Sequence, residues 1–277
     1  MRTQTGLLLL TWLGAAVRFP SLFANRFHAD EALFASWARL IAVWRDPLLQ
    51  HTAVDKPPLL FYFQAIFYPL QGPVEWAARL PNFIVSILLI PLVGMIVWEV
   101  SGIRCQGSGV RGQVSGVRGA VWVAAGLVAF SPLAIQFSAT AFTDPLMSFW
   151  VVLALWFVLR KRAFTAGFIF GLALATKYQA LLFAPLLIVF AWQMGWSGRQ
   201  WVRAAAGWLI PLTAVVGWEV ARTGTFGLWT AQMSSYGGVR LAWSWELRPR
   251  LVGWLYLLPY VLGWGWLIGG FQVSGFR

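Results

Sequence analysis

The feature that most constrains this chain is a series of apolar segments that recur along its length. Hydrophobic residues make up 59% of the 277 residues and charged residues only 11%, whereas soluble domains carry about 25% charged residues. A helix that crosses a bilayer needs about 20 mostly apolar residues. The sequence therefore predicts an all-α polytopic membrane protein. We expect eight spans, at about Gly6–Phe23, Ala78–Val100, Ala120–Gln136, Pro145–Leu159, Phe164–Thr176, Ala180–Met194, Ala204–Val220 and Leu251–Gly270.

Two parts of this series allow an alternative. A cleaved signal peptide could replace the first span, but Arg18 and Pro20 interrupt its end and no small-residue cleavage site follows, which favours an uncleaved span. The stretch Phe164–Met194 could be one tilted helix, but it is long for one crossing and holds a polar tip at residues 176–179, so we predict a hairpin of two helices. Small residues recur every fourth position in its first half, a pattern typical of close helix packing: Ala163, Gly167, Gly171 and Ala175.

The segment between the first two spans, residues 25–77, departs from the apolar pattern. Its part from His28 to Gly72 holds four of the nine carboxylates and both histidines. Apolar residues recur at helical spacing from Leu33 to Trp44, and a second apolar run, Leu59–Leu70, is too short to span a bilayer. We predict two amphipathic helices on the membrane surface, with Asp55 as the N-cap of the second.

The basic residues bear on orientation. The net charge is +12, but Lys and Arg do not form one long tract, and several lie in short loops between spans, where positive-inside topology explains them. Nucleic acid is therefore not expected as a partner. The number of Lys and Arg is equal on the two sides, so the dense cluster Arg160–Arg162 decides for a cytoplasmic N-terminus. The first outer loop, residues 25–77, then lies outside the cytoplasm.

Residues 101–119 differ in kind from the rest of the chain. SGIRCQG, SGVRGQV and SGVRG are successive units of a glycine-rich, seven-residue repeat, which predicts a flexible cytosolic loop. Residues 271–277 form a low-complexity tail, in which Gln272–Arg277 copies Gln113–Arg118 with one change. This copy favours a truncated protein, with residues 1–270 as its transmembrane domain. The lone Cys105 excludes an internal disulfide and a cysteine-based zinc site.

Ionisable residues gather on the predicted outer side. Each is explained alone by helix capping, since carboxylates are common at helix starts, but capping does not explain why all fall on one side. Ionisable groups at membrane depth are functional candidates. His28, Asp30 and His51 match no compact metal-ligand pattern, so neither a metal nor another cofactor is expected. The functional candidates on this side are Asp30, Glu31, Asp55, Lys56, Asp144 and Lys177.

Five motifs, taken in order, resemble the N-terminal part of GT-C glycosyltransferases of the protein O-mannosyltransferase and aminoarabinose–lipid A transferase superfamily. The resemblance covers about residues 1–220 and depends on the order and positions of the motifs, since each is weak singly. Family members are usually longer. The motifs are Asp30-Glu31 after the first span, Asp55-Lys56-Pro57-Pro58-Leu59, Arg79-Leu80-Pro81, Phe137-Ser138 followed by Thr143-Asp144, and Gly171 followed by Thr176-Lys177.

The resemblance implies a multi-pass glycosyltransferase of the cell membrane. Its donor would be a polyprenyl-phosphate-linked sugar, its acceptor a lipid, glycan or protein on the non-cytoplasmic face, and its reaction an inverting single displacement. Catalytic roles would fall to Asp30, Glu31 and Asp144, and donor-phosphate binding to Lys56, Lys177 and Arg79. A carboxylate suits a general base, and cations suit a departing phosphate.

Two alternatives remain open at this point. One is a truncated, inactive member of the same enzyme family, which the copied C-terminal repeat favours. The other is a transporter or channel, in which intramembrane charges mark a permeation path. Transporters often show inverted repeats and broken helices in mid-span. The sequence shows no such internal symmetry, and its acidic groups cluster at one face.

Overall fold

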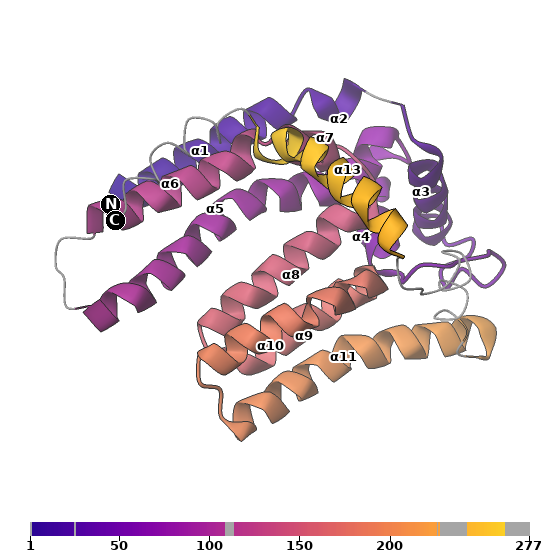
Figure 1. The fold of residues 1–277 in the computed structure, drawn as a ribbon. Coiled ribbons are helices and arrows are strands. Elements are labelled where there is room, and N and C mark those ends of the chain that lie inside the picture. The colour runs from indigo at the N-terminus through magenta and orange to yellow at the C-terminus, as the bar shows by residue number, and fades with distance from the viewer. Residues whose placement is uncertain (1, 25, 109–113, 226, 228–242, 264–277) are drawn as a thin grey trace.

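The computed structural model describes residues 2–24, 26–108, 114–225, 227 and 243–263, and these form helices with no strand among them (Figure 1). This confirms the predicted all-α fold. In chain order the elements are α1 (Arg2–Arg18), α2 (Ser21–Ala24), α3 (Ala29–Ala42), α4 (Leu59–Gln71), α5 (Glu75–Ser108), α6 (Val114–Phe130), α7 (Pro132–Ser138), α8 (Thr143–Leu159), α9 (Ala163–Thr176), the 3₁₀ helix η1 (Tyr178–Phe183), α10 (Ala184–Gln193), α11 (Gly198–Thr223) and α13 (Ser244–Leu262).

Helix length limits how many of the eight predicted spans can cross a bilayer. Among the residues that the structure describes, three stretches are long and apolar enough: Gln4–Phe23, Glu75–Ser101 and Gly198–Thr223. A fourth is added if α6 and α7, which bend by 53° at their junction, act as one span. The helix α8 has 17 residues and α9 has 14, so they are about 25 and 21 Å long, less than the hydrocarbon thickness of about 30 Å. Length and composition thus support three or four spans. Residues 264–270 of the last predicted span lie outside the described residues.

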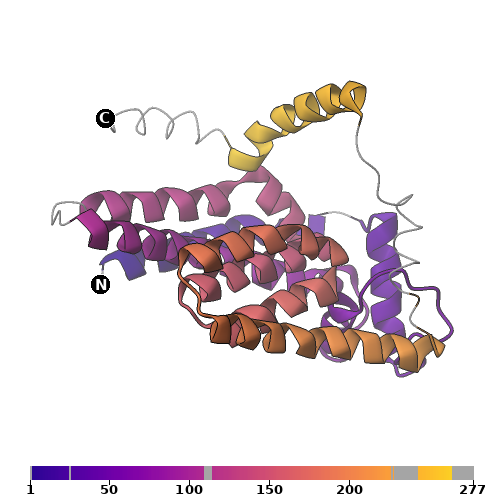
Figure 2. The same ribbon diagram turned by 60° about the horizontal axis from the view of Figure 1, so that its bottom comes forward.

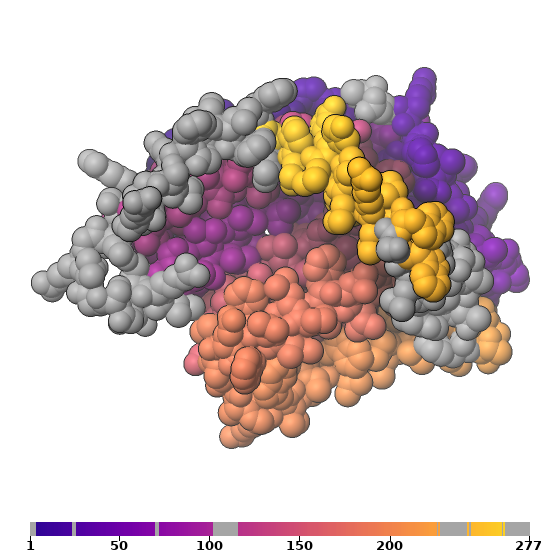
Figure 3. Space-filling model, viewed as in Figure 1, coloured from indigo at the N-terminus to yellow at the C-terminus, as the bar shows by residue number. Residues whose placement is uncertain are grey.

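The helices form two groups that meet along α5 and α8. In Figure 1, α1, α5 and α6 lie together, while α8, α9, α10 and α11 form the second group. The helices α3 and α4 lie at one end of both groups, and the N-terminus lies at the other. In Figure 3, α13 lies across the viewed face, but Figure 2 shows that it projects away from the bundle. Its described contact is at one end, where the Ser131 hydroxyl donates to the carbonyls of Tyr260 and Val261.

The two predicted amphipathic helices are present as α3 and α4. Their aromatic residues form one core, in which the Trp37 and Phe61 rings meet edge to face with centroids 4.8 Å apart. The predicted N-cap of α4 is wrong. This helix begins at Leu59, the N-cap position is Pro58, and no side chain caps it. Asp55 pairs with Lys56 instead. A helix that starts behind two prolines has fewer N–H groups for a cap to satisfy.

The predicted hairpin is present. The chain leaves α9 at Lys177 and returns through η1 and α10, so that α9 begins and α10 ends at the same end of the bundle (Figure 1). The small-residue ladder of α9 packs on α11. A Cβ added to Gly167 would lie 1.9 Å from the Ala204 carbonyl oxygen, and one added to Gly207 would lie 2.1 Å from the Phe164 carbonyl oxygen. Two backbones therefore touch here, which requires glycine on both helices.

The repeat is not the loop that its composition predicts. The structure continues α5 as helix to Ser108 and begins α6 at Val114, so only residues 109–113 of the predicted loop lie outside the described residues. Once a helix has nucleated, each further residue adds a backbone hydrogen bond. The cost of a glycine in a helix, about 1 kcal/mol, is insufficient to end a helix that is already 26 residues long at Val100. The low-complexity tail, residues 271–277, also lies outside the described residues.

Close packing of α9 on α11 gives a test with a matched control. We expect Gly167→Ala to destabilise the protein by about 1–3 kcal/mol, because the new methyl group overlaps the α11 backbone. Gly217→Ala, on the same helix pair, has open space around its Cβ and should be neutral or stabilising by up to about 1 kcal/mol. Thermal unfolding in detergent measures both. Equal melting temperatures for the two variants would contradict the packing described here.

Candidate functional site

A polar pocket of about 300 Å³ lies beside α3, where α8 begins and α9 ends. Four separate segments line it: the first two turns of α3, the loop before α4, the start of α8 with the residue before it, and the residue after α9. Five of the six ionisable residues that the sequence analysis gave as functional candidates line this pocket. Its lining residues are Asp30, Leu33, Phe34, Asp55, Lys56, Phe142, Thr143, Asp144 and Lys177.

Lys177 reaches the pocket because the chain is extended where α9 stops. Its backbone N–H still donates to the Ala173 carbonyl at 2.9 Å, which completes the last turn. Its Nζ lies 2.7 Å from Asp144 Oδ1. The Lys177 side chain is largely buried, whereas the Asp144 side chain is half exposed. The pair thus presents its carboxylate to the open side of the pocket.

Lys56 supplies a second, equally shielded cation. It lies on the loop before α4, its side chain is 11% exposed, and its ammonium group pairs with the neighbouring Asp55. Two prolines follow directly and fix the backbone as it enters α4. Both lysines of the pocket are therefore held next to a carboxylate and away from bulk water.

Asp30 is the accessible carboxylate of the pocket. It lies in the first turn of α3, and its side chain is 62% exposed. Capping of α3 is done by other groups: the His28 ring nitrogen Nδ1 accepts from the Asp30 backbone N–H at 3.3 Å, and Glu31 accepts from the His28 backbone N–H at 2.9 Å. The Asp30 carboxylate is thus not the cap that its position suggested.

Glu31 and Arg79 do not line the pocket; they form a buried ion pair behind it. The side chains of Glu31 and Arg79 are 5% and 1% exposed, and Arg79 Nε lies 3.3 Å from Glu31 Oε1. Arg79 also donates to the carbonyls of Leu22 and Arg26, and its guanidinium lies 5.1 Å from the Phe27 ring centroid. This geometry favours a positioning role for both residues over direct contact with a ligand.

The segment before α8 is held by two side chains. The Ala141 N–H donates to Glu31 Oε1 at 2.7 Å. Asn82 Nδ2 donates to the carbonyls of Thr140 and Phe142, both at 2.7 Å. These bonds fix the start of α8 and hence Asp144. Sequence reasoning missed Asn82, although it directly follows the Arg79-Leu80-Pro81 motif that was singled out.

A second buried ion pair holds the loop that carries Lys56. On the last turns of α11, the Arg222 guanidinium donates two hydrogen bonds of 3.2 Å to the Glu219 carboxylate. Arg222 Nη1 also donates to the carbonyls of Leu49 and Thr52, and Gln50 Nε2 donates to the Ala221 carbonyl. Nothing local in the sequence signalled this contact, because its partners are about 170 residues apart.

An aromatic bridge reinforces the same contact. The Trp218 indole donates to the Tyr62 hydroxyl at 3.0 Å, and that hydroxyl donates to the Pro47 carbonyl at 2.7 Å. Burial raises the pKa of Tyr62, opposed by the hydrogen bond from Trp218. The hydroxyl therefore keeps its proton at neutral pH and can donate to the loop. Among the described residues, no group of three or more His, Cys, Asp or Glu could hold a metal ion.

Comparison with known proteins supports the fold. The structure is similar to the crystal structure of ArnT from Cupriavidus metallidurans in the apo state, with a TM-score of 0.64 and 18% sequence identity. The chain shares the GT-C fold of ArnT. The similarity covers 94% of this chain and 50% of the ArnT chain, so the protein spans about half the length of that relative. No protein-family model and no curated protein sequence matches the chain.

Neutralising the two adjacent carboxylates of α3 should lower stability by very different amounts. Glu31→Gln leaves Arg79 buried without its counter-charge, so we expect a loss of about 3–5 kcal/mol in stability. Asp30→Asn, at an exposed position, should cost less than about 1 kcal/mol. Chemical denaturation in detergent measures the two variants side by side. A Glu31→Gln protein as stable as Asp30→Asn would show that the ion pair with Arg79 does not hold the fold.

The Glu219–Arg222 pair predicts a recovery by double substitution. Arg222→Leu should cost about 3–5 kcal/mol, since Glu219 stays buried as an unpaired charge. Replacing both residues by Leu should regain part of that loss, as no buried charge remains. The exposed pair of Arg26 and Glu75 provides a control, because Arg26→Leu should cost less than about 1 kcal/mol. A double variant no more stable than Arg222→Leu would argue against charge burial as the cause.

Proposed function

We propose that this protein is a membrane glycosyltransferase that uses a polyprenyl-phosphate-linked sugar as donor. The observation that carries the proposal is the pocket itself, in which two shielded lysines and an accessible carboxylate converge from separate segments. The shared fold of ArnT, a GT-C aminoarabinose transferase, supports the same reaction class. The acceptor is a lipid, glycan or protein hydroxyl or amine.

Each pocket residue has a chemical role in the proposed reaction. The acceptor attacks the anomeric carbon, and Asp30 accepts its proton as general base. The bond from the anomeric carbon to the phosphate oxygen breaks, and the phosphate leaves with increased negative charge. Lys56 and Lys177 stabilise that charge. Asp144 orients Lys177, and Glu31 with Arg79 fixes the start of α3. A single displacement of this kind inverts the anomeric centre.

Sidedness follows from charge. The pocket lies where α8 begins, and the Arg160–Arg162 cluster directly follows the other end of the same helix (Figure 1). If that cluster faces the cytoplasm, as the positive-inside rule favours, the pocket opens on the non-cytoplasmic side of the cell membrane. A transporter or channel is the rival function, and no observation favours it over a transferase, because the charged pocket lies at one end of the bundle.

Binding and turnover can be tested separately. We expect Lys56→Met and Lys177→Met each to weaken binding of a polyprenyl phosphate about 10–100-fold, since each removes a charge-assisted contact. Lys161→Met, an exposed lysine at the opposite end, is the matched control and should bind normally. Asp30→Asn should bind the donor normally but lower sugar transfer by about 10²–10⁴-fold.

The measurements are a titration with polyprenyl phosphate in detergent and the release of polyprenyl phosphate from a sugar-linked donor. If Lys161→Met weakens polyprenyl-phosphate binding as much as the pocket variants do, the pocket is not the phosphate-binding site. An Asp30→Asn protein that transfers sugar at the parental rate would leave Asp30 without a catalytic role. Binding without any turnover by the parental chain would make it an inactive relative.

A further inference from the structure

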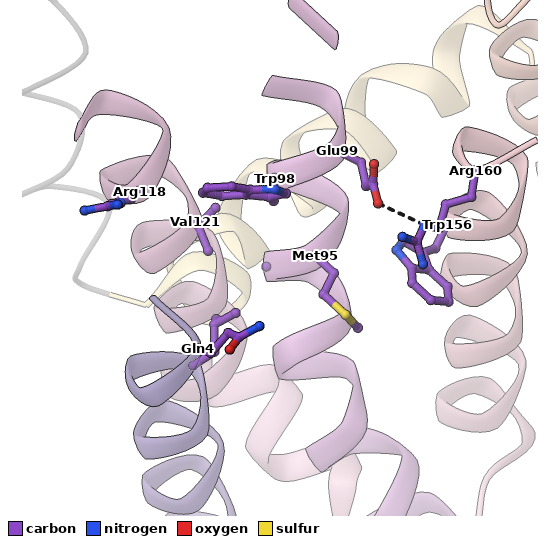
Figure 4. A pocket seen from close by; sticks show the side chains of 10 residues that line it. Gln4, Met95, Trp98, Glu99, Arg118, Val121, Trp156 and Arg160 are labelled. Carbon is purple, nitrogen blue, oxygen red and sulfur yellow. Dashed lines mark ion pairs between the residues drawn. The ribbon is translucent and has the colours of Figure 1, made fainter. Parts of the chain in front are cut away.

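A larger cavity, which we call the end cavity, lies at the opposite end of the bundle from the candidate active site. Its volume is about 460 Å³, within the range of small-ligand sites. It lies between α1, α5, α6 and α8, where residues 94–99 of α5 face the C-terminal end of α8 (Figures 1 and 4). Its lining residues are Gln4, Leu7, Gly94, Met95, Trp98, Glu99, Arg118, Val121, Trp156 and Arg160.

The polar groups of the end cavity centre on Arg160. Figure 4 shows Arg160, directly after α8, and Glu99 of α5 facing each other, with 3.0 Å between Arg160 Nε and Glu99 Oε1. The guanidinium lies 4.9 Å from the Trp156 ring centroid. The contact with Glu99 uses Nε, whereas the terminal nitrogens carry four more N–H donors in a planar fork that matches a phosphate group.

The ion pair of the end cavity is not needed to hold α5 on α8. Its side chains are 50% and 31% exposed, and exposed pairs contribute little to stability. Glu99 can therefore yield Arg160 to another anion at small cost. In Figure 4, Arg118 points away from this pair, so it adds positive potential at the rim and is no direct partner. With Glu99 and both arginines, the net charge of the lining is +1.

The remaining lining indicates a ligand that is part apolar. Trp98 and Met95 are each more than a third exposed, and Trp side chains favour the boundary between lipid and water. The Trp156 indole N–H is buried without a hydrogen-bond partner among the described residues. A phospholipid offers a partner for each of these groups. Its phosphate suits Arg160, its other polar oxygens can accept from the Trp156 N–H, and its acyl chains can contact the exposed Trp98 and Met95 as they pass into the bilayer.

We propose that the end cavity binds the headgroup of an anionic phospholipid, with its phosphate on the Arg160 guanidinium. Basic pockets between transmembrane helices bind such headgroups, and the predicted topology places this end toward the cytoplasmic leaflet, which is rich in anionic lipid. The assignment does not depend on the proposed transfer reaction, since neither Arg160 nor Glu99 touches that pocket.

The test is a lipid titration of the full chain in detergent, read by native mass spectrometry. Phosphatidylglycerol is the probe, phosphatidylcholine the neutral comparison, and inorganic phosphate the soluble one. We expect one phosphatidylglycerol molecule to be retained per chain, in preference to phosphatidylcholine. Arg160→Gln should weaken this binding about fivefold. Arg199→Gln removes the same charge from an exposed position at the same end, outside the cavity, and should leave binding unchanged.

Glu99→Gln gives a test of opposite sign. It releases Arg160 and should tighten phosphatidylglycerol binding, and it decides the matter even where Arg160→Gln yields no folded protein. Unchanged affinity in Glu99→Gln overturns the proposal, as does equal weakening by Arg160→Gln and Arg199→Gln. Equal retention of phosphatidylcholine removes the anionic selectivity. If inorganic phosphate binds as tightly as phosphatidylglycerol, the cavity is a site for free phosphate and the proposed lipid site is wrong.

Discussion

The buried ion pair of Glu31 and Arg79 is the interaction on which the candidate site depends. Glu31 accepts from the start of α3 through the His28 N–H and from the segment before α8 through the Ala141 N–H. Arg79, on α5, adds the carbonyls of Leu22 and Arg26. This one ion pair thus links α2, the start of α3, α5 and the segment before α8. A buried carboxylate needs a counter-charge and several hydrogen bonds, so these segments cannot shift independently, and Asp30 and Asp144 are fixed relative to each other.

The short helices α8 and α9 determine where the pocket lies along the bundle. Because α8 and α9 have 17 and 14 residues, they end before a full bilayer crossing. Asp144 at the start of α8 and Lys177 directly after α9 then meet in the pocket beside α3. Charged groups in an apolar helix bundle are costly unless paired, and Lys177 Nζ lies 2.7 Å from Asp144 Oδ1. Because α8 and α9 are this short, neither counts as a membrane span by length.

The sequence predicted those features whose cause is local. Apolar periodicity placed α3 and α4, and the spacing of Gly167 and Gly171 predicted the close face of α9. Five of the six candidate ionisable residues on the predicted outer side line the pocket. The sequence could not separate Asp30 from Glu31, since adjacent residues on a helix point in different directions and only the partner, Arg79, decides which is buried. It also could not show Asn82 or the Glu219–Arg222 pair, whose contacts join segments 58 to 173 residues apart. The glycine-rich composition of the repeat wrongly predicted a loop. A helix that has already formed can continue through glycines, although the same glycines would not start a helix.

The way in which the pocket lysines are paired bears on how the proposed reaction gains rate. Lys56 and Lys177 each have a carboxylate partner, and with Asp30 the five charges sum to −1. A donor phosphodiester, with one negative charge, must compete with those carboxylates for the lysines and binds only moderately. As the bond to the sugar breaks, the departing phosphate gains charge and competes better. Interactions that strengthen in this way lower the barrier, whereas those equal in the ground state and transition state do not. The carboxylates beside the lysines thus direct the stabilisation toward the leaving group.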